Sequence, residues 1–458
     1  MNKILIVVYI SALLAGMVSC QPAAPVATPT SPPATTTPTP QPDLTIELDP
    51  NDLRQTIREV GGGNFIHLFS GSMSTLEPVS QLNIQTLNPT VIRVRLGLED
   101  WEPVNDNNDS LAVAADRFQD TGYNHAAFDL MHTMRTQYSV THIIATVWDV
   151  PNWLVQNPGE TRNRIIPLEN YPEAVESIAQ WLVHARDVYG VEVDYVSFNE
   201  PNIGVNVALT SADEIEMIRL AGPRFAALGL KTKWLLGDCS NMGGCINYVT
   251  PIWATEEIRP YLGPLAIHSW DSSASDWVLE EIAAFAQKEG LDVWCTEAGW
   301  DPFLWESREM FPKWFNGLEL AMIYSRVLKL SRVSVMDYWQ MMGQDYSLNN
   351  GQTLYPALEV LHQFKIHFPA GSQVIDSSKN SDFFLNVAAR TPAGFSVALV
   401  NINGEPVVVE ITGLPDGIYT LTRVSETDRE TVAGMYTSAG GRLIVEIAPA
   451  SVNFISTK

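Results

Sequence analysis

Strand-like and helix-like segments alternate along most of this chain, and this alternation restricts the possible folds more than any other feature. Short apolar runs rich in β-branched residues recur, and amphipathic stretches separate most of them. The runs span residues 61–68, 91–96, 142–148, 193–198, 233–237, 265–270, 292–296 and 333–339. Eight strands with intervening helices predict an α/β fold, a closed parallel (β/α)8 barrel. A doubly wound open sheet is the alternative, but no glycine-rich phosphate loop follows an early strand.

The pattern changes after about residue 370. Short alternating stretches follow, and glycine, proline, asparagine and aspartate separate them. These stretches span residues 382–388, 394–400, 407–411, 418–424, 443–447 and 451–455. They predict an antiparallel β-sandwich at residues 370–458, after a barrel at residues 44–369 whose first residues pair with the sandwich. Because the sandwich contains no tryptophan, we expect it to pack against the barrel rather than to bind carbohydrate.

The N-terminus has the features of an export signal. Lys3 precedes an apolar run at residues 4–18, which is shorter than the about 20 residues that a membrane-spanning helix needs. The run ends at Ser19-Cys20, which resembles a bacterial lipobox. We therefore predict a lipoprotein signal peptide at residues 1–20 with lipidation at Cys20; a plain secretory peptide cleaved nearby is the alternative.

Residues 21–43 consist mostly of proline, threonine, alanine, glutamine and serine. Such a segment buries too little apolar area to offset its ordering entropy, so it predicts an extended linker. Together with the signal, it predicts an extracytoplasmic protein at a bacterial cell surface, lipid-anchored or alternatively secreted. The lipid anchor would be its only contact with the membrane.

Composition excludes some classes of partner. The formal net charge of −24 and the absence of a basic stripe argue against nucleic acid. With 46% hydrophobic and 17% charged residues the chain has ample material for a core, and its 13 tryptophans are compatible with a neutral sugar ligand. The sequence does not indicate the oligomeric state.

The cysteines suggest at most one disulfide. Cys239 and Cys245 lie close together in the sequence and could form a small-loop disulfide in an oxidising compartment. Cys295 lies inside an apolar run and is expected to be buried. No cysteine and histidine spacing indicates zinc, although a structural calcium stays open. The two-carboxylate mechanism considered below requires no metal or organic cofactor, so we predict none.

Two short segments carry most of the chemical information: residues 198–201 (Phe-Asn-Glu-Pro) and residues 294–300 (Trp-Cys-Thr-Glu-Ala-Gly-Trp). Each has a glutamate, Glu200 or Glu297, at the end of an apolar run just before a turn. A retaining glycosidase on a (β/α)8 barrel needs two such carboxyl groups, one as proton donor and one as nucleophile, roughly 5–5.5 Å apart. The alternative is two solvated loop glutamates. We predict an enzyme.

These segments resemble the large clan of retaining (β/α)8 glycoside hydrolases, and family 30 most of all, from about residue 44 to the C-terminus. The resemblance implies that Glu200 is the acid/base and Glu297 the nucleophile, and that Asn199 points at the 2-hydroxyl of the sugar. It also implies that Arg93 supports the nucleophile and holds the pKa of Glu297 down.

The aromatic residues of the motifs extend the resemblance. Asp100-Trp101 is similar to the family's Asp-aromatic pair, whose aspartate binds sugar hydroxyls. Trp148 begins a Trp-x-x-Pro-x-Trp turn and would flank the sugar, and Trp339 would lie beneath it.

One strand departs from the family pattern. The segment His268-Ser269-Trp270 stands where the family often has histidine, an aromatic residue and then a tyrosine that hydrogen-bonds the nucleophile. An indole N–H can donate a hydrogen bond but is not a hydroxyl. The support of the nucleophile is therefore open, and His268 could take part of it or could be a core histidine.

The sequence thus predicts a retaining β-glycosidase that hydrolyses β-linked glycans or glycosides by double displacement, with a carbohydrate as its partner. Another enzyme of the same clan, such as a xylosidase, endoglucanase or mannanase, is the first alternative. A non-catalytic surface glycan-binding lipoprotein is the second. The sugar, the linkage and the choice between exo and endo action are not readable from the sequence.

Overall fold

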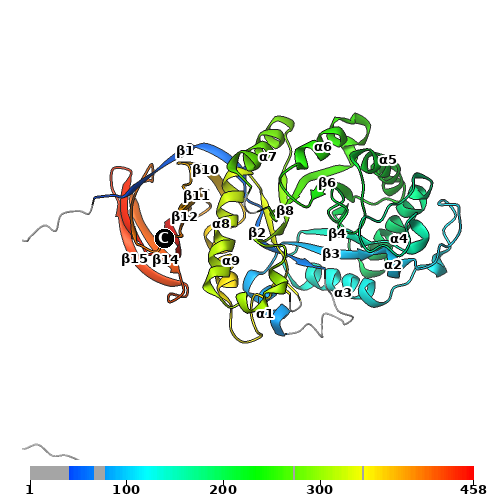
Figure 1. Ribbon diagram of the computed structural model, residues 1–458, viewed down its shortest axis with the longest axis horizontal. Helices are drawn as coiled ribbons and strands as arrows, with labels where there is room; N and C mark the ends of the chain where they lie inside the picture. The colour runs from blue at the N-terminus through cyan, green and yellow to red at the C-terminus, as the bar shows by residue number, and fades with distance from the viewer. Residues whose placement is uncertain (1–40, 67–77, 272–273, 343–344, 458) are drawn as a thin grey trace, which may run out of the picture. The chain divides into compact units, whose positions relative to one another are not determined.

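A computed structural model of the chain describes residues 41–66, 78–271, 274–342 and 345–457. The predicted signal peptide with Cys20, and the predicted linker up to residue 40, lie outside the described residues. Elements are labelled as in Figure 1.

Eight parallel strands close into a barrel, as the alternating pattern predicts. The strands are β2 (Glu59–Phe65), β3 (Val91–Gly97), β4 (His142–Asp149), β5 (Tyr195–Phe198), β6 (Lys233–Cys239), β7 (Leu262–His268), β8 (Val293–Ala298) and β9 (Val335–Tyr338). The described helices are α1 (Pro78–Leu87), α2 (Leu98–Trp101), α3 (Gly122–Gln137), α4 (Tyr171–Tyr189), α5 (Ser211–Ala227), α6 (Cys245–Ala254), α7 (Asp276–Glu289), α8 (Trp314–Leu330) and α9 (Pro356–His367). Figure 1 shows the helices around the barrel strands.

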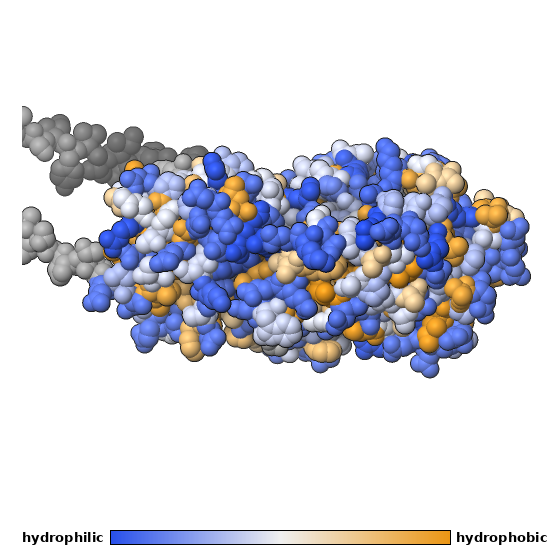
Figure 2. All heavy atoms as spheres, turned by 90° about the horizontal axis from the view of Figure 1, so that it is seen from above, coloured by the Kyte–Doolittle hydropathy of each residue, from blue (hydrophilic) through white to orange (hydrophobic). Residues whose placement is uncertain are grey.

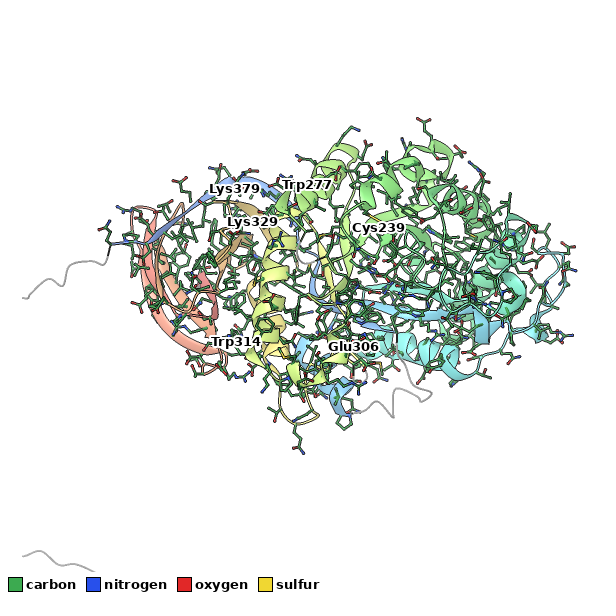
Figure 3. All side chains as sticks on the ribbon, viewed as in Figure 1. Cys239, Trp277, Glu306, Trp314, Lys329 and Lys379 are labelled. Atoms are coloured by element: carbon green, nitrogen blue, oxygen red, sulfur yellow. A yellow bond between two sulfur atoms is a disulfide. The ribbon has the colours of Figure 1, made fainter. Side chains whose placement is uncertain are left out.

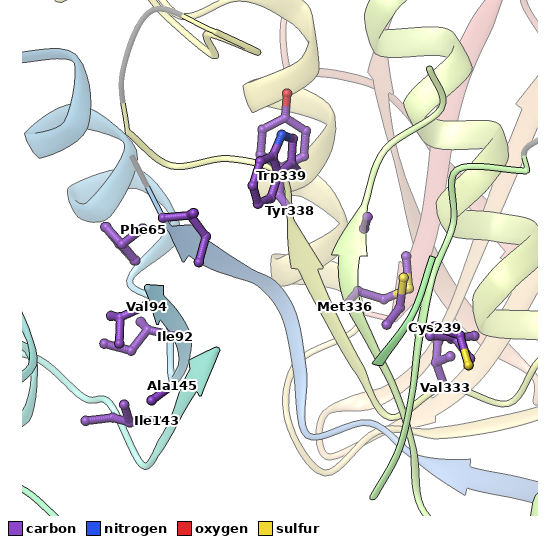
Figure 4. Packing of buried hydrophobic residues seen from close by; sticks show 14 of the residues in the cluster. Phe65, Ile92, Val94, Ile143, Ala145, Cys239, Val333, Met336, Tyr338 and Trp339 are labelled. Atoms are coloured by element: carbon purple, nitrogen blue, oxygen red, sulfur yellow. The ribbon is translucent and has the colours of Figure 1, made fainter. Parts of the chain in front are cut away.

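Successive side chains along each barrel strand point alternately to the core beneath the helices and to the interior of the barrel. Ile92 and Val94 of β3 lie beside Ile143 and Ala145 of β4 and belong to the main core, which the surrounding helices share (Figure 4). Every second residue points to the inside of the barrel instead. A small apolar cluster fills one level of the interior: Val91, Ile144, Leu235, Ala266, Trp294 and Val335. This cluster makes the barrel a packed core rather than a pore.

The second domain is one nine-stranded sheet, in the order β15-β14-β17-β12-β11-β10-β1-β13-β16. Its strands are β1 (Leu44–Thr56), β10 (Gln373–Ser377), β11 (Phe384–Thr391), β12 (Gly394–Asn401), β13 (Val407–Thr412), β14 (Gly417–Val424), β15 (Thr431–Ser438), β16 (Arg442–Ile447) and β17 (Ser451–Thr457). Strand β1 pairs with β13 in parallel up to Glu47 and then, from Leu48 onward, with β10 in antiparallel. The sheet folds over its apolar face, so that Val409 and Val445 share a core with Leu399 and Ile455.

This domain packs against helices α8 and α9 of the barrel. Phe364 of α9 meets Phe454 of β17 edge-on with ring centroids 5.1 Å apart. The indole of Trp314 donates a hydrogen bond to the carbonyl of Ala450 at 2.7 Å. Figure 3 labels Trp314 and Lys329 on α8, and the ammonium of Lys329 donates to Oδ1 of Asn386 in β11 at 3.1 Å. The predicted packing of the β-domain on the barrel is therefore observed.

The face in Figure 2 is mostly hydrophilic, with hydrophobic residues in separate small groups. Within the described ranges, no helix combines the length and the apolar character that crossing a bilayer requires. Cys239 at the end of β6 and Cys245 at the start of α6 form a disulfide with 5.8 Å between their Cα atoms. Cys295 is a buried free thiol.

Candidate active site

The first candidate catalytic residue, Glu200, lies just past the end of β5. Strand β5 stops at Phe198, and the chain turns immediately, with the N–H groups of Ile203 and Gly204 donating to the carbonyl of Glu200. Glu200 has a φ of 46°, a left-handed conformation that is uncommon for a side chain of this size. The turn leaves its carboxyl group 7% exposed as a lining residue of a cavity.

The second, Glu297, lies within β8 and is 3% exposed. The guanidinium of Arg93 donates to its Oε1 at 2.5 Å. The indole of Trp270 donates to its Oε2 at 3.0 Å, and Nδ1 of His268 lies 3.3 Å from the same oxygen. Trp270 therefore does supply the hydrogen bond that the sequence left open.

The two carboxyl groups are close together. One oxygen of Glu200, one of Glu297 and one ring nitrogen of His268 all lie within 4.8 Å of one another. Retaining glycosidases have their carboxyl groups roughly 5–5.5 Å apart, whereas inverting enzymes keep roughly 6.5–9.5 Å for a water molecule. The spacing here fits the retaining geometry.

Arg93 is completely buried in the interior of the barrel and uses all five of its N–H donors. In addition to Glu297, it donates to Thr146 at 2.9 Å, Asn64 at 3.0 Å, Asn199 at 2.8 Å and Asp238 at 2.9 Å. These residues form a polar level above the apolar cluster of the interior. The guanidinium thereby holds the nucleophile, the neighbouring amide of Asn199 and Asp238 in fixed positions.

Asp238 is a charged residue of this site that the sequence did not reveal. It follows Gly237 at the irregular end of β6, is fully buried, and also accepts hydrogen bonds from Ser197 at 2.7 Å and Thr296 at 2.6 Å. Burial by itself would raise its pKa, but Arg93 and His268 hold the pKa of this carboxyl well below its usual range. The available signal was an acidic residue inside an otherwise apolar run.

His268 connects the three acids. Its Nε2 lies 3.2 Å from Asp238, and its Nδ1 lies 3.1 Å from Oε1 of Glu200. Burial alone would lower the pKa of His268, but the charge of Glu297 and the hydrogen bonds to Asp238 and Glu200 outweigh it and raise the pKa to about 10. His268 is therefore an imidazolium at neutral pH, and both of its nitrogens donate.

The expectation of a low pKa for Glu297 is not met. Burial raises the pKa of this carboxyl, and the charges of His268 and Arg93 only oppose that increase. The physical reason is the nearly complete removal of Glu297 from water, together with the carboxyl groups of Glu200 and Asp238 nearby.

A cavity of about 740 Å³ opens over the two glutamates. Four tryptophans line it, together with Phe303 and Tyr346: Trp148, Trp270, Trp305 and Trp339. Trp148 stacks on Trp339 with ring centroids 5.5 Å apart and planes at 10°. Gln340 also lines the cavity and is 2% exposed, and no described residue forms a hydrogen bond with the oxygen or nitrogen of its side-chain amide. Apolar walls with a few unsatisfied polar groups are typical of a small-molecule site.

Five predicted substrate residues do not line the cavity: Arg93, Asn199 and His268 belong to the polar cluster around the two glutamates, whereas Asp100 and Trp101 have no contact with that cluster among the described interactions. Trp101 is 2% exposed, packs against Phe128 and donates its indole N–H to the carbonyl of Ser177 at 3.2 Å. It belongs to the core because α2 begins directly after β3 and turns this side chain inward. Asp100, from the same helix, does not line the cavity either.

Among the described residues, two groups of side chains have a spacing that could hold a metal ion. One is Glu200, His268 and Glu297. The ring nitrogens of His268 face carboxylates, so the imidazolium already occupies the place of a cation there. The second group consists of acidic residues and lies outside the cavity.

No protein-family model matches the chain, and no curated protein matches it by sequence. Several solved structures, in contrast, align with the chain in three dimensions. A glycoside hydrolase family 30 subfamily 8 xylanase from Clostridium acetobutylicum aligns with a TM-score of 0.71 at 15% identity, over 90% of this chain and 98% of that one. The catalytic domain of xylanase C of the same family from Talaromyces cellulolyticus aligns with a TM-score of 0.69 at 17% identity, over 90% and 99%.

An endo-β1,6-glucanase aligns with a TM-score of 0.62 at 16% identity, over 92% of this chain and 94% of that one. Likeness at such identities concerns the fold. The barrel with its attached β-domain is the architecture of glycoside hydrolase family 30 structures, as the motifs predicted.

Proposed function

We propose that this protein is a retaining β-glycosidase, with Glu297 as the nucleophile and Glu200 as the acid/base. The fold and the spacing of the two carboxyl groups support a glycoside hydrolase. The proposal extends to the mechanism and to the roles of the individual residues.

The charge balance of the buried cluster carries this assignment. Arg93 and the imidazolium of His268 are two cations, and three carboxyl groups surround them: Asp238, Glu297 and Glu200. Buried charges are stable only when they are paired. Two carboxylates balance the two cations, so one carboxyl group can hold a proton. Glu200 makes no ion pair with Arg93 in the structure, whereas Asp238 and Glu297 do, so we assign the role of proton donor to Glu200.

The reaction follows from these roles. A carboxylate oxygen of Glu297 bonds to the anomeric carbon while the bond to the leaving oxygen breaks, and Glu200 gives that oxygen its proton. Glu200 then takes a proton from water, the water oxygen bonds to the anomeric carbon, and the bond to Glu297 breaks. Two inversions retain the configuration.

Asn199 would stabilise the transition state more than it stabilises the bound substrate. Among the described residues, none accepts a hydrogen bond from Nδ2 of Asn199, although Asn199 is 1% exposed, so this amide is available for a sugar hydroxyl. The stacked Trp148 and Trp339 would pack against the apolar face of the sugar. Interactions that strengthen as charge develops accelerate the reaction.

The sugar and linkage remain to be assigned by experiment. The structural neighbours include proteins described as xylanases and as an endo-β1,6-glucanase. Other specificities of the same clan, and a non-catalytic glycan-binding role, are the competing proposals. Binding alone would not need two carboxyl groups, Glu200 and Glu297, at the spacing of a retaining glycosidase.

A panel of aryl β-glycosides tests the proposal: glucoside, xyloside, fucoside, galactoside and mannoside, followed by xylan and β-glucans. We expect turnover of at least one, lost in Glu297→Ala and restored by azide as an inverted glycosyl azide. Glu200→Ala should keep activity only on substrates with good leaving groups. Binding of a glycan without hydrolysis of any member of the panel would favour the non-catalytic role.

We further propose that the mature protein is a surface lipoprotein, on the basis of the Ser19-Cys20 signal and the proline-rich stretch that follows. Expression in a bacterial host with labelled fatty acid should label the wild type and not Cys20→Ser. Release of unlabelled wild type into the medium would identify a plain secretory peptide.

A further inference from the structure

A second cluster of carboxyl groups, partly buried, lies outside the cavity. Asp106 follows α2 in the chain, and Glu173 and Glu176 lie near the start of α4. One carboxylate oxygen from each of the three lies within 4.8 Å of the other two. Glu102 lies beside them, because its Oε1 accepts a hydrogen bond from the backbone N–H of Asp106 at 3.1 Å.

Several carboxylate oxygens of this cluster have no hydrogen-bond partner among the described residues. Glu176 is 1% exposed, and neither of its carboxylate oxygens accepts a hydrogen bond from the described residues. Glu102 is 2% exposed, and its Oε2 lacks a partner in the same way, as does Oδ1 of Asp106. Buried polar groups in native proteins are nearly always paired, so these oxygens indicate a ligand.

Positive charge near the cluster is insufficient. Arg224 approaches Oε1 of Glu176 only to 3.9 Å, beyond hydrogen-bond distance. One guanidinium at that distance faces four carboxyl groups. A buried anion that has no partner is expensive, so a cation in the cluster would remove a large penalty.

We propose that Asp106, Glu173 and Glu176, with Glu102 beside them, bind a calcium ion. The candidate ligand atoms are all oxygens, which is the set that Ca²⁺ and Mg²⁺ prefer. Ca²⁺ takes six to eight such ligands in a flexible geometry, whereas Mg²⁺ demands a near-ideal octahedron and keeps several waters. Three or four clustered carboxyl groups from a loop and a helix therefore suit Ca²⁺ better. This site is independent of the proposed hydrolase activity.

A shared proton is the rival state of the cluster. Glu173 and Glu176 are close enough for a hydrogen bond between them if one is protonated. Glu176→Gln separates the two states, because the amide removes a negative charge and a calcium ligand without removing bulk.

Trp153 offers a spectroscopic probe. Its indole donates to the backbone carbonyl of Glu102 at 2.8 Å, so it lies next to the proposed site. Terbium(III) binds calcium sites, and energy transfer from a nearby tryptophan makes it luminesce. Trp153→Phe should reduce that luminescence without reducing calcium affinity.

The test uses the protein with both its barrel and its β-domain, after a chelator has removed bound metal. Calcium binding is then measured by calorimetric titration with CaCl₂ and by thermal unfolding at increasing CaCl₂. We expect one ion per chain and a rise of a few degrees in Tm at saturation. Asp106→Asn and Glu176→Gln should lose the bound ion and the rise in Tm. Asp116→Asn changes an exposed acid on the same loop as Asp106 and should keep the ion and the rise in Tm. Glu176→Gln should be at least as stable as the stripped wild type, which shows that it folds.

Two results would overturn the proposal. The first is a wild type without calcium heat or Tm shift, which identifies the shared proton as the resting state. The second is undiminished binding in both Asp106→Asn and Glu176→Gln, which places the ion elsewhere.

Discussion

The indole N–H of Trp270 donates a hydrogen bond to Oε2 of Glu297 across 3.0 Å, while Arg93 holds Oε1. Family 30 enzymes often have a tyrosine hydroxyl at the position of Trp270. The indole preserves the donor but supplies no proton acceptor and no ionisable group. Both carboxylate oxygens of Glu297 are thus oriented by N–H donors, and neither donor accepts a proton at neutral pH.

Replacement of Trp270 tests this orientation. Trp270→Phe keeps an aromatic wall and removes a hydrogen bond to a charged acceptor, which is worth roughly 1.5–3 kcal/mol. We expect kcat/KM to fall by about 10- to 150-fold on the best substrate. Trp277→Phe, an exposed tryptophan on α7 (Figure 3), is the control and should leave kinetics unchanged. Equal rates for Trp270→Phe and wild type would show that the indole does not support the nucleophile.

Asp238 should matter for stability as well as for the site. Asp238→Asn leaves Arg93 and His268 with one fewer buried counter-charge, and breaking a buried ion pair costs about 3–5 kcal/mol. The free energy of unfolding from denaturant titration should fall by that amount. Asp276→Asn breaks an ion pair with Arg326 at the surface and should change it by about 1 kcal/mol or less. A loss below 1 kcal/mol in Asp238→Asn would contradict the network.

The sequence predicted the strand-end residues of this site better than the buried residues that hold them in place. Strand-end positions of Asn199, Glu200 and Glu297 follow from apolar runs that stop at a turn, because parallel strands of a barrel end on one face. Asp238 was missed because the run appeared to end at Gly237. The irregular backbone there, with φ of 96° at Gly237 and 50° at Asp238, depends on neighbouring strands and is not encoded by local periodicity.

Burial was the property that the motifs could not specify. Trp101 and Trp148 are both tryptophans near the end of a barrel strand, yet Trp101 lies in the core and Trp148 lines the cavity. Strands β10 and β15 were missed as well. The first is only five residues long and the second is mostly exposed, so neither shows a clear alternation of apolar residues.

The protonation of His268 predicts a pH dependence. Its pKa in the folded protein, about 10, lies above the ordinary value of 6.5, so its contribution to stability is complete below about pH 6.5 and is lost as the pH rises toward 10. Over that window the loss is about 1.4 kcal/mol per pH unit. Lys329 has a pKa lowered to about 7 and titrates with the opposite sign, so it opposes the effect of His268 on the total stability.

The difference between wild type and His268→Asn isolates this contribution. Denaturant titrations at pH 7, 8 and 9 should show the stability advantage of the wild type shrinking at each step. A constant difference for His268→Asn would mean that His268 is neutral throughout.

The disulfide should stabilise the end of β6. It closes a loop with a sequence separation of 6, for which the chain-entropy model gives about 2 kcal/mol. Denaturant titration with and without reductant should show that difference. The double variant Cys239→Ser, Cys245→Ser should be insensitive to reductant. An insensitive wild type would mean that the bridge does not form.

Trapping of the glycosyl-enzyme tests the central claim most directly. A 2-deoxy-2-fluoro-β-glycoside of the best hydrolysed sugar should inactivate the wild type, and peptide mapping by mass spectrometry should find the sugar on Glu297. Trp277→Phe should be labelled like the wild type, and Glu297→Gln should not be labelled. Label on another carboxyl group, or steady turnover with inversion and no label, would contradict the proposed nucleophile.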